Sequence, residues 1–389
     1  MYNFVNFAHG TTFALNLYCF LLYCFLLLIS LRGNVVELYT KDNYRTRTVL
    51  LFCGLLLFAL TSFVGDDFFH YYEFMYEYRG QVFGDQEIGL EAFYQYLISF
   101  IDGNYFLFRL VVWGGSLVLI TSATRKFEAN TYHTLFLILA GFIITFSYAR
   151  ATLAMAVFSV GAVLISVASE SNIKKRVIPT ILGLIIIACS MYFHRSMLPM
   201  IIISLGWVCM PWKRQITKYS IWLFPIFVAI CSFVLKSAFE ELFTVANSVE
   251  DDTGTLTRAE YYAEQEAVVS NVNGYIRLVF HYAAFYIPFL IVGNAVRSNS
   301  VLDNMDKRHI WLYQIIYLTF IFSASFLFME VDMGTLLDRY LYMSFIPMSI
   351  LIASMKDSEL LSKRQYLWIV VTFILSNLFQ LFVAVYSKA

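Results

Sequence analysis

The sequence predicts an all-α polytopic membrane protein with about 12 transmembrane helices, and its composition is the first reason. Of 389 residues, 60% are hydrophobic and only 14% are charged, whereas soluble domains contain about 45–50% apolar and about 25% charged residues. Aromatic residues make up 18% of the chain, which is typical of proteins with two membrane–water interfaces. This composition excludes a soluble enzyme, a disordered protein and a nucleic-acid-binding protein. It predicts a single transmembrane domain over residues 1–389.

Long apolar stretches recur along the whole chain, and a helix needs about 20 such residues, with about 17 as the short limit, to cross a membrane. On this rule we predict twelve spans, at 12–31, 48–64, 104–123, 132–148, 151–169, 177–193, 196–211, 219–236, 273–296, 310–328, 340–355 and 366–386. Residues 132–169 could form one long helix, but Arg150 would then lie near its middle, where an unpaired charge is costly. We therefore predict a hairpin that turns near Ser147–Arg150.

The positions of Lys and Arg orient these spans. With the hairpin in place, 18 of the 27 basic residues fall in loops on one side, which we predict to be cytoplasmic, with both termini outside. The other side carries two large loops, 65–104 and 237–272, each with eight acidic residues and one arginine. Unstructured connections longer than about 12–15 residues are usually functional or disordered. We therefore expect the activity at the outer face.

Five arginines do not fit this charge pattern, because each lies within a predicted span or at its outer end: Arg109, Arg150, Arg195, Arg277 and Arg339. A single one could extend to lipid headgroups or pair with an acidic neighbour. Five arginines from five different spans favour an anion site instead. The planar guanidinium suits phosphate oxygens, so the expected ligand near the outer leaflet is a lipid with a diphosphate headgroup.

Polar and aromatic residues near the outer face extend this predicted site. His194 precedes Arg195 at a helix end, although a lone membrane histidine more often bonds two helices together. Glu87 and Glu91, one helical turn apart, suit either a helix start or catalytic carboxylates. The first loop also contains candidate sugar-binding residues, which equally suit an interfacial aromatic belt: Asp66, Tyr71, Tyr72 and Tyr76.

We predict neither a metal nor a cofactor. A metal site at Asp66 and Asp67, or at Glu330 and Asp332, is the alternative, but these spacings supply fewer oxygen ligands than hard cations need. The chain also has no Gly-rich nucleotide loop.

Short motifs along the chain resemble the EpsG-like branch of the Wzy-type polysaccharide polymerases. In chain order they are Asp67 with Tyr71, Glu87-Ile88-Gly89-Leu90, Arg150-Ala151-Thr152-Leu153-Ala154, Phe193-His194-Arg195-Ser196 and Arg339-Tyr340. The resemblance spans roughly residues 60–345. Leu90 departs from the family's usual aromatic residue, and Arg195 is an additional charge beside the histidine.

The resemblance implies a GT-C-like fold and a multi-pass polymerase of the bacterial inner membrane, acting at the periplasmic face. The implied substrates are oligosaccharide repeat units on undecaprenyl diphosphate, as donor and acceptor, with membrane lipid, a chain-length regulator and a flippase as candidate partners. The diphosphate is expected at Arg150, Arg195, Arg277 and Arg339, with Arg109 in support. The catalytic base is expected among His194, Asp67, Glu87 and Glu91. Two alternatives stay open: a glycan ligase that uses the same carrier, and a transporter or flippase.

Overall fold

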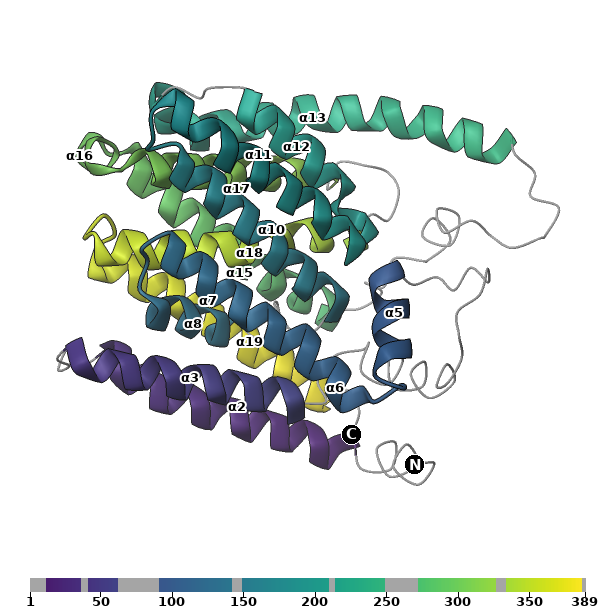
Figure 1. Ribbon diagram of the computed structural model, residues 1–389, viewed down its shortest axis with the longest axis vertical. Coiled ribbons are helices and arrows are strands. Elements are labelled where there is room, and N and C mark those ends of the chain that lie inside the picture. The colour runs from purple at the N-terminus through teal and green to yellow at the C-terminus, as the bar shows by residue number, and fades with distance from the viewer. Residues whose placement is uncertain are drawn as a thin grey trace.

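The computed structural model of the chain is a bundle of helices that run between two common ends (Figure 1). It describes residues 12–35, 41–61, 91–141, 149–209, 214–248, 272–326 and 334–386. Within these ranges every regular element is a helix. The predicted all-α class is therefore confirmed for the part of the chain that the structure describes.

Each of the twelve predicted ranges overlaps a helix or a nearly continuous helical segment, and twelve membrane spans stay a prediction. These are α2 (Thr12–Val35), α3 (Lys41–Thr61), α6 (Tyr105–Arg109) continuing through the π-helix η1 (Leu110–Gly114) into α7 (Gly115–Lys126), α8 (Thr131–Ala140), α10 (Ala149–Ala168), α11 (Ile173–Cys189), α12 (Leu198–Cys209), α13 (Arg214–Ser248), α15 (Val272–Arg297), α17 (Lys307–Ser325), α18 (Gly334–Asp357) and α19 (Lys363–Tyr386). Four short elements lie between them: α5 (Ala92–Phe100), the 3-10 helices η2 (Ser190–Tyr192) and η3 (Arg195–Met197), and α16 (Asn299–Asn304). The predicted second external loop begins as helix, since α13 continues to Ser248.

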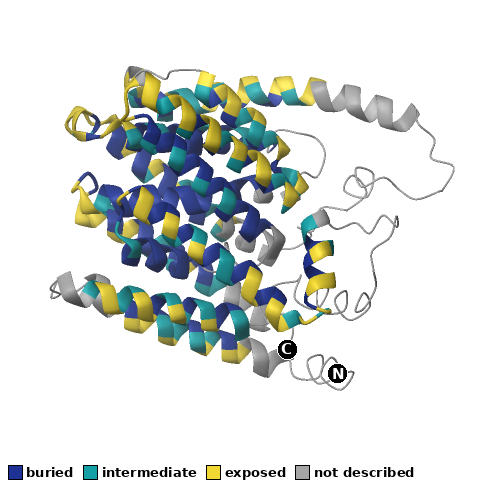
Figure 2. Cartoon of the chain, viewed as in Figure 1, coloured by how far each residue is buried: buried dark blue, intermediate teal, exposed yellow. Residues whose placement is uncertain are grey.

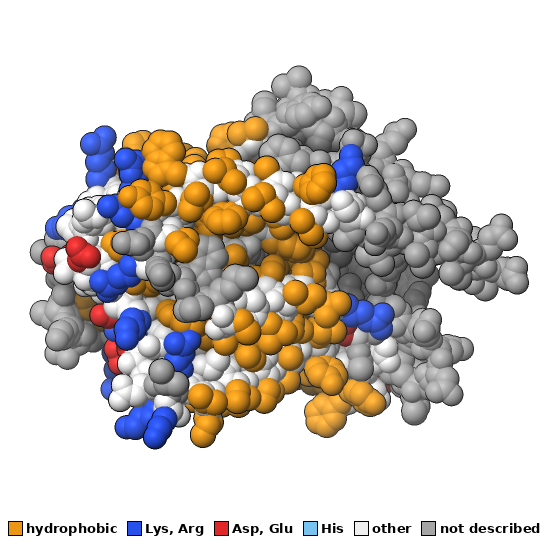
Figure 3. Space-filling model, turned by 90° about the horizontal axis from the view of Figure 1, so that it is seen from above, with side chains coloured by type: hydrophobic (Ala, Val, Ile, Leu, Met, Phe, Trp, Pro, Cys, Tyr) orange, Lys and Arg blue, Asp and Glu red, His pale blue; other side chains and the backbone are white. Residues whose placement is uncertain are grey.

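The surface of the bundle is that of a membrane protein. Among the described residues, five helical segments are long and apolar enough to cross a membrane: Tyr44–Thr61, Tyr105–Lys126, Ala151–Ala168, Lys174–Tyr192 and Ile216–Ser237. Large apolar side chains such as Leu28, Ile178 and Phe233 are 68%, 76% and 75% exposed, which suits lipid better than water. Figure 3 shows an apolar surface with most of the visible Lys and Arg side chains at one end.

We call this end the basic end; it contains the turns 127–130, 169–172, 298–306 and 358–362. The opposite end, to which α5, η2 and η3 belong, is called the loop end here. It carries the described part of the predicted loop 65–104, and α13 reaches beyond the rest of the bundle there (Figure 1).

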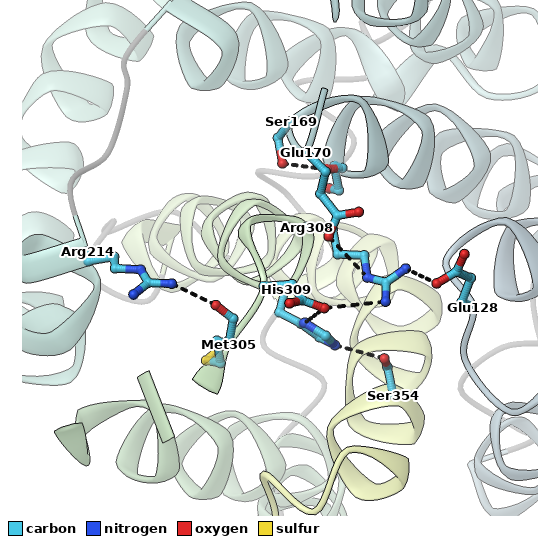
Figure 4. A network of polar contacts seen from close by, with 10 residues as sticks. Glu128, Ser169, Glu170, Arg214, Met305, Arg308, His309 and Ser354 are labelled. Carbon is cyan, nitrogen blue, oxygen red and sulfur yellow. Dashed lines mark hydrogen bonds and ion pairs between the residues drawn. The ribbon is translucent and has the colours of Figure 1, made fainter. Parts of the chain in front are cut away.

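The two helices of the predicted hairpin, α8 and α10, are antiparallel, while residues 142–148 between them lie outside the described residues. Glu128 lies in the turn before α8 and Glu170 in the turn after α10, and both carboxylates pair with Arg308 of α17 (Figure 4). The Arg308 guanidinium donates a hydrogen bond to Glu128 and lowers the pKa of that carboxyl group. Two helices whose start and finish share one arginine must run in opposite directions.

Helix α10 is the centre of the bundle. Of the segment Ala151–Ala168, 78% is buried, and the helix packs against α7, α11, α17 and α18. Figure 2 shows it almost wholly enclosed. Its contact with α11 is close because glycines meet there: a Cβ on Gly161 would lie 2.6 Å from the carbonyl oxygen of Gly183. Small residues permit such a backbone approach between membrane helices.

Candidate functional site

The predicted site residues differ in how far the structure describes them. Side chains are described for Glu91, Arg109, His194 and Arg195, and the backbone alone is described for Arg150, Arg277 and Arg339. The remaining candidates lie outside the described residues: Asp66, Asp67, Tyr71, Tyr72, Tyr76 and Glu87.

A break between α11 and α12 forms the first part of the site, and we call residues Ser190–Met197 the elbow. It consists of η2, then Phe193 and His194, then η3. His194 is extended, with φ −160° and ψ 117°. Pro199 follows in the first turn of α12, where its missing N–H costs nothing, whereas inside one continuous helix it would remove a backbone hydrogen bond. The sequence therefore favours two helices joined by an elbow over one straight helix.

The His194 ring has a defined hydrogen-bonding state in this elbow. Its Nδ1 accepts a hydrogen bond from the backbone N–H of Ser196 at 3.2 Å and so caps η3. In a neutral imidazole one nitrogen accepts while the other carries the proton. With Nδ1 as the acceptor, a neutral ring has its proton on Nε2.

Glu91 reaches the elbow from the end of the first predicted loop. Its Oε1 accepts a hydrogen bond from the backbone N–H of Arg195 at 3.2 Å. The glutamate is only 6% exposed, whereas the Arg195 side chain is exposed. Beside this hydrogen bond the rings of Phe93 and Phe193 meet edge to face, with centroids 4.6 Å apart. The structure thus brings together three predicted residues, Glu91, His194 and Arg195.

Local sequence holds α5, and with it Glu91, in this position. Tyr94 on α5 is buried and contacts Phe108 of α6, with ring centroids 6.0 Å apart. The chain then reverses through Asp102 and Gly103, which have positive φ angles of 51° and 64°; glycine adopts such angles without strain. Asn104 caps α6 by accepting the N–H of Leu107 at 3.2 Å.

Arg109 lies apart from these hydrogen bonds, on α6. It is 5% exposed, and its guanidinium carbon lies 4.9 Å from the ring centroid of Trp113 and 5.7 Å from that of Tyr105. Cation–π contacts of this kind stabilise a buried cation. The π-helix η1 begins directly after Arg109, and such bulges are frequent at functional sites. The supporting role predicted for Arg109 stays a prediction.

Helix α10, which contains Arg150, packs against the first part of the elbow. Arg150 is the second residue of α10, and α10 packs against both η1 and η2. Gly161 of α10 faces Gly183 and Ile187 of the antiparallel α11. Because α11 ends at Cys189, Arg150 lies past the end of that helix, on the side of the bundle where the elbow turns. The α10 N-terminus also adds partial positive charge on this side.

The helices that contain Arg339 and Arg277 both begin at the loop end of the bundle. Arg339 is near the start of α18, which packs against α10, and the next residue, Tyr340, stacks on Phe326 with ring centroids 5.5 Å apart. Arg277 is near the start of α15, which packs against α13, α18 and α19. Four arginine positions thus share the loop end with Arg109. Convergence of their side chains on one anion stays a prediction.

Sequence reasoning did not find the partners that build the elbow. Phe193 and Ser196 belong to one of the family motifs named above. Nothing in the sequence, however, predicts that Phe93 contacts Phe193 or that Glu91 accepts the Arg195 amide. These contacts join residues about a hundred positions apart.

Together, the described fold and site define a polytopic helical membrane protein with arginines and a histidine elbow at one end. The chain matches the model of the EpsG family over residues 44–389, and it belongs to that family. This confirms the resemblance inferred from the motifs and indicates a polysaccharide polymerase, with glycosyltransferase-type activity in general. Searches of curated proteins and of solved structures found no match.

Proposed function

We propose that this protein polymerises oligosaccharide repeat units carried on a lipid diphosphate, with undecaprenyl as the lipid. It acts at the periplasmic face of the bacterial inner membrane, as a twelve-span protein with a GT-C-like fold. The observation that carries the proposal is the elbow, where Glu91, His194 and Arg195 meet and against whose first part, η2, helix α10 packs. Family membership supplies the reaction class.

The proposed role of the arginines is to bind the diphosphate of the donor. Negative charge develops on this leaving group during transfer, and preorganised donors stabilise it, at about 2.7–4 kcal/mol per donor in comparable sites. The exposed Arg195 side chain and the N-terminus of α10 support an anion at the loop end. Arg150, Arg277 and Arg339 complete the proposed set, with Arg109 in a supporting position.

In the proposed reaction, a hydroxyl oxygen of the acceptor repeat unit attacks the anomeric carbon of the donor glycan. The bond between that carbon and the diphosphate oxygen breaks, and the lipid diphosphate leaves with the electron pair. The hydroxyl proton goes to a general base, which contributes about 10²–10⁴-fold to the rate. Each cycle lengthens the glycan by the units transferred and releases one lipid diphosphate.

We assign His194 to the diphosphate rather than to the hydroxyl proton. Its Nδ1 accepts the Ser196 amide, so a neutral ring has its proton on Nε2, and we propose that Nε2–H donates to a phosphate oxygen when the donor binds. The general base is then sought among the first-loop carboxylates, with Asp67 and Glu87 as the candidates. The same loop contains the proposed sugar-binding residues Asp66, Tyr71, Tyr72 and Tyr76.

The position of the arginines supports a transferase over a transporter. A transporter of a charged lipid needs ionisable residues near the membrane midplane and paired broken helices. Arg150 is instead the second residue of its helix, and Arg277 is the sixth of its own.

The test is reconstitution of the purified protein in liposomes with lipid-diphosphate-linked repeat units. If the protein is a polymerase, the products separate on a gel as a ladder of increasing length. A single product on a different lipid acceptor identifies a ligase instead. Unchanged substrate with every component present contradicts the proposal.

A further inference from the structure

We propose that Glu91 is a positioning residue that fixes the His194–Arg195 elbow through the Arg195 amide, and that it is not the general base. This inference rests on the proposed function, because the elbow is taken to bind the donor diphosphate. It changes the role expected for Glu91 from the sequence.

The hydrogen bond reaches the peptide group that controls the elbow. The N–H of Arg195 belongs to the peptide bond between His194 and Arg195, and it donates to Glu91 Oε1 at 3.2 Å. Holding this peptide plane restricts ψ of His194 and φ of Arg195 together. These two angles determine how the imidazole and the guanidinium are directed relative to each other. Loss of the acceptor would therefore misdirect both proposed diphosphate ligands.

The second contact of the elbow acts on the next peptide group, between Arg195 and Ser196. The Ser196 amide donates to His194 Nδ1 at 3.2 Å, so two consecutive backbone amides, those of Arg195 and Ser196, are bound by side chains. One of these side chains lies within the elbow, and the other comes from the start of α5. The edge contact of Phe93 with Phe193 keeps α5 against the elbow. The first predicted loop thus ends in an anchor on the diphosphate side of the site.

Burial argues against Glu91 as the base. Glu91 is 6% exposed, and one of its oxygens is occupied by the Arg195 amide. A general base must come within about 2.6–3.2 Å of the hydroxyl proton that it removes. A sugar hydroxyl cannot approach a carboxylate that is enclosed in this way without displacing α5.

Two conservative variants separate the roles. Glu91→Gln keeps the length of the side chain and a carbonyl oxygen that accepts the Arg195 amide, but it cannot take a proton. Glu91→Asp keeps the charge and basicity, but its oxygens withdraw by about 1.5 Å, the length of one C–C bond. If Glu91 is a positioning residue, Glu91→Gln should be more active than Glu91→Asp. If Glu91 is the base, Glu91→Asp should be the more active variant. Glu128→Gln at the basic end is the control, because it removes one carboxylate of an ion pair far from the elbow.

Rates per folded molecule are measured with reconstituted protein and lipid-diphosphate-linked repeat units. We expect Glu91→Gln to stay within about threefold of wild type with an unchanged pH–rate profile. We expect the rate of Glu91→Asp to fall by about 10- to 100-fold, because misplacing reacting groups by about 1 Å slows a reaction by this order. Loss of about 10²–10⁴-fold in Glu91→Gln with a milder effect in Glu91→Asp identifies a base. Equal rates in both variants, with only the melting temperature lowered, reduce Glu91 to a structural residue; either result overturns the inference.

Hydrogen–deuterium exchange of the same full-length proteins tests the contact without any activity. The Arg195 amide should be protected in wild type and in Glu91→Gln, and should exchange at least about tenfold faster in Glu91→Asp. Equal exchange in all three proteins contradicts the inference, whether or not the protein polymerises. Absence of a ladder from wild type contradicts the proposed function alone, since the exchange experiment still decides the role of Glu91.

Discussion

Glu91 and Arg195 are 104 residues apart in the chain and are joined by one hydrogen bond, from the Arg195 amide to Glu91 Oε1. Through this bond the end of the first predicted loop is attached to the elbow between α11 and α12. The loop contains the candidate sugar-binding residues, and the elbow contains the candidate diphosphate ligands. The hydrogen bond is therefore a direct link between the two halves of the proposed site.

Arg150 is the residue whose loss should be most damaging. It is near the N-terminus of the central helix α10, which packs against η2 of the elbow. Arg150→Ala should abolish polymer in cells, because one lost donor costs about 2.7–4 kcal/mol, or about 10²–10³-fold in rate. Polymer length is measured on gels, and Arg125→Ala at the basic end is the matched control. Wild-type chain lengths in Arg150→Ala, with normal insertion, would remove Arg150 from the site.

Two amide substitutions of His194 separate a hydrogen-bond donor from a base. Gln resembles the Nε2 side of the ring and can donate there, whereas Asn resembles the Nδ1 side and keeps only the cap for Ser196. A donor role predicts that His194→Gln retains more activity than His194→Asn, which should lose about 10²–10³-fold. The rates are measured per folded molecule. If both variants are equally inactive while their folding is normal, His194 is the base after all.

The fold could be predicted further than the site because the membrane imposes it locally. Apolar length and the placement of Lys and Arg are properties of short segments, so they predicted where helices lie in the described residues and that α8 and α10 run in opposite directions. The length of α13 was not predictable in this way: its polar continuation beyond residue 236 lacks the apolar signal, yet it remains helical to Ser248. The π-helix η1 within 104–123 also leaves no mark in composition.

Packing of α10 on α11 depends on the absence of a side chain at Gly161. A Cβ there would lie 2.6 Å from a backbone oxygen and 2.6 Å from Cγ1 of Ile187. Gly161→Ala should therefore lower the free energy of unfolding by about 1–3 kcal/mol, the usual cost of overpacking. Gly206→Ala is the control, since a Cβ at Gly206 has no neighbour within 4 Å, and alanine favours the helix by about 1 kcal/mol. Unfolding in detergent measures both, and equal stability of the two variants would refute the close crossing.

Catalysis should proceed without a divalent metal, because arginines supply the positive charge. Among the described residues no group of three or more potential metal ligands occurs, while Asp66, Asp67, Glu330 and Asp332 lie outside them. Activity of the reconstituted protein should survive an excess of chelator. Complete loss that only magnesium or manganese restores would assign those carboxylates to a metal site.

The site could be predicted only as a set of unusual residues, without their arrangement. An arginine that departs from the predicted distribution of Lys and Arg can be recognised in the sequence. Five were identified in this way: Arg109, Arg150, Arg195, Arg277 and Arg339. The hydrogen bond from the Arg195 amide to Glu91 joins residues about a hundred positions apart. The ring nitrogen of His194 that accepts the Ser196 amide depends on the geometry of the elbow. Neither can be read from the sequence. For this reason sequence reasoning assigned Glu91 and His194 to one list of possible bases.

The most direct test of the central claim is to count lipid diphosphate against glycosidic linkages. Reconstituted protein is incubated with lipid-diphosphate-linked repeat units, and the released lipid diphosphate is measured together with the ladder of products. The proposed transfer predicts one lipid diphosphate released for each linkage formed, and no ladder when the donor carries a lipid monophosphate. A ladder formed from the monophosphate donor, or linkages without release of lipid diphosphate, would contradict the account.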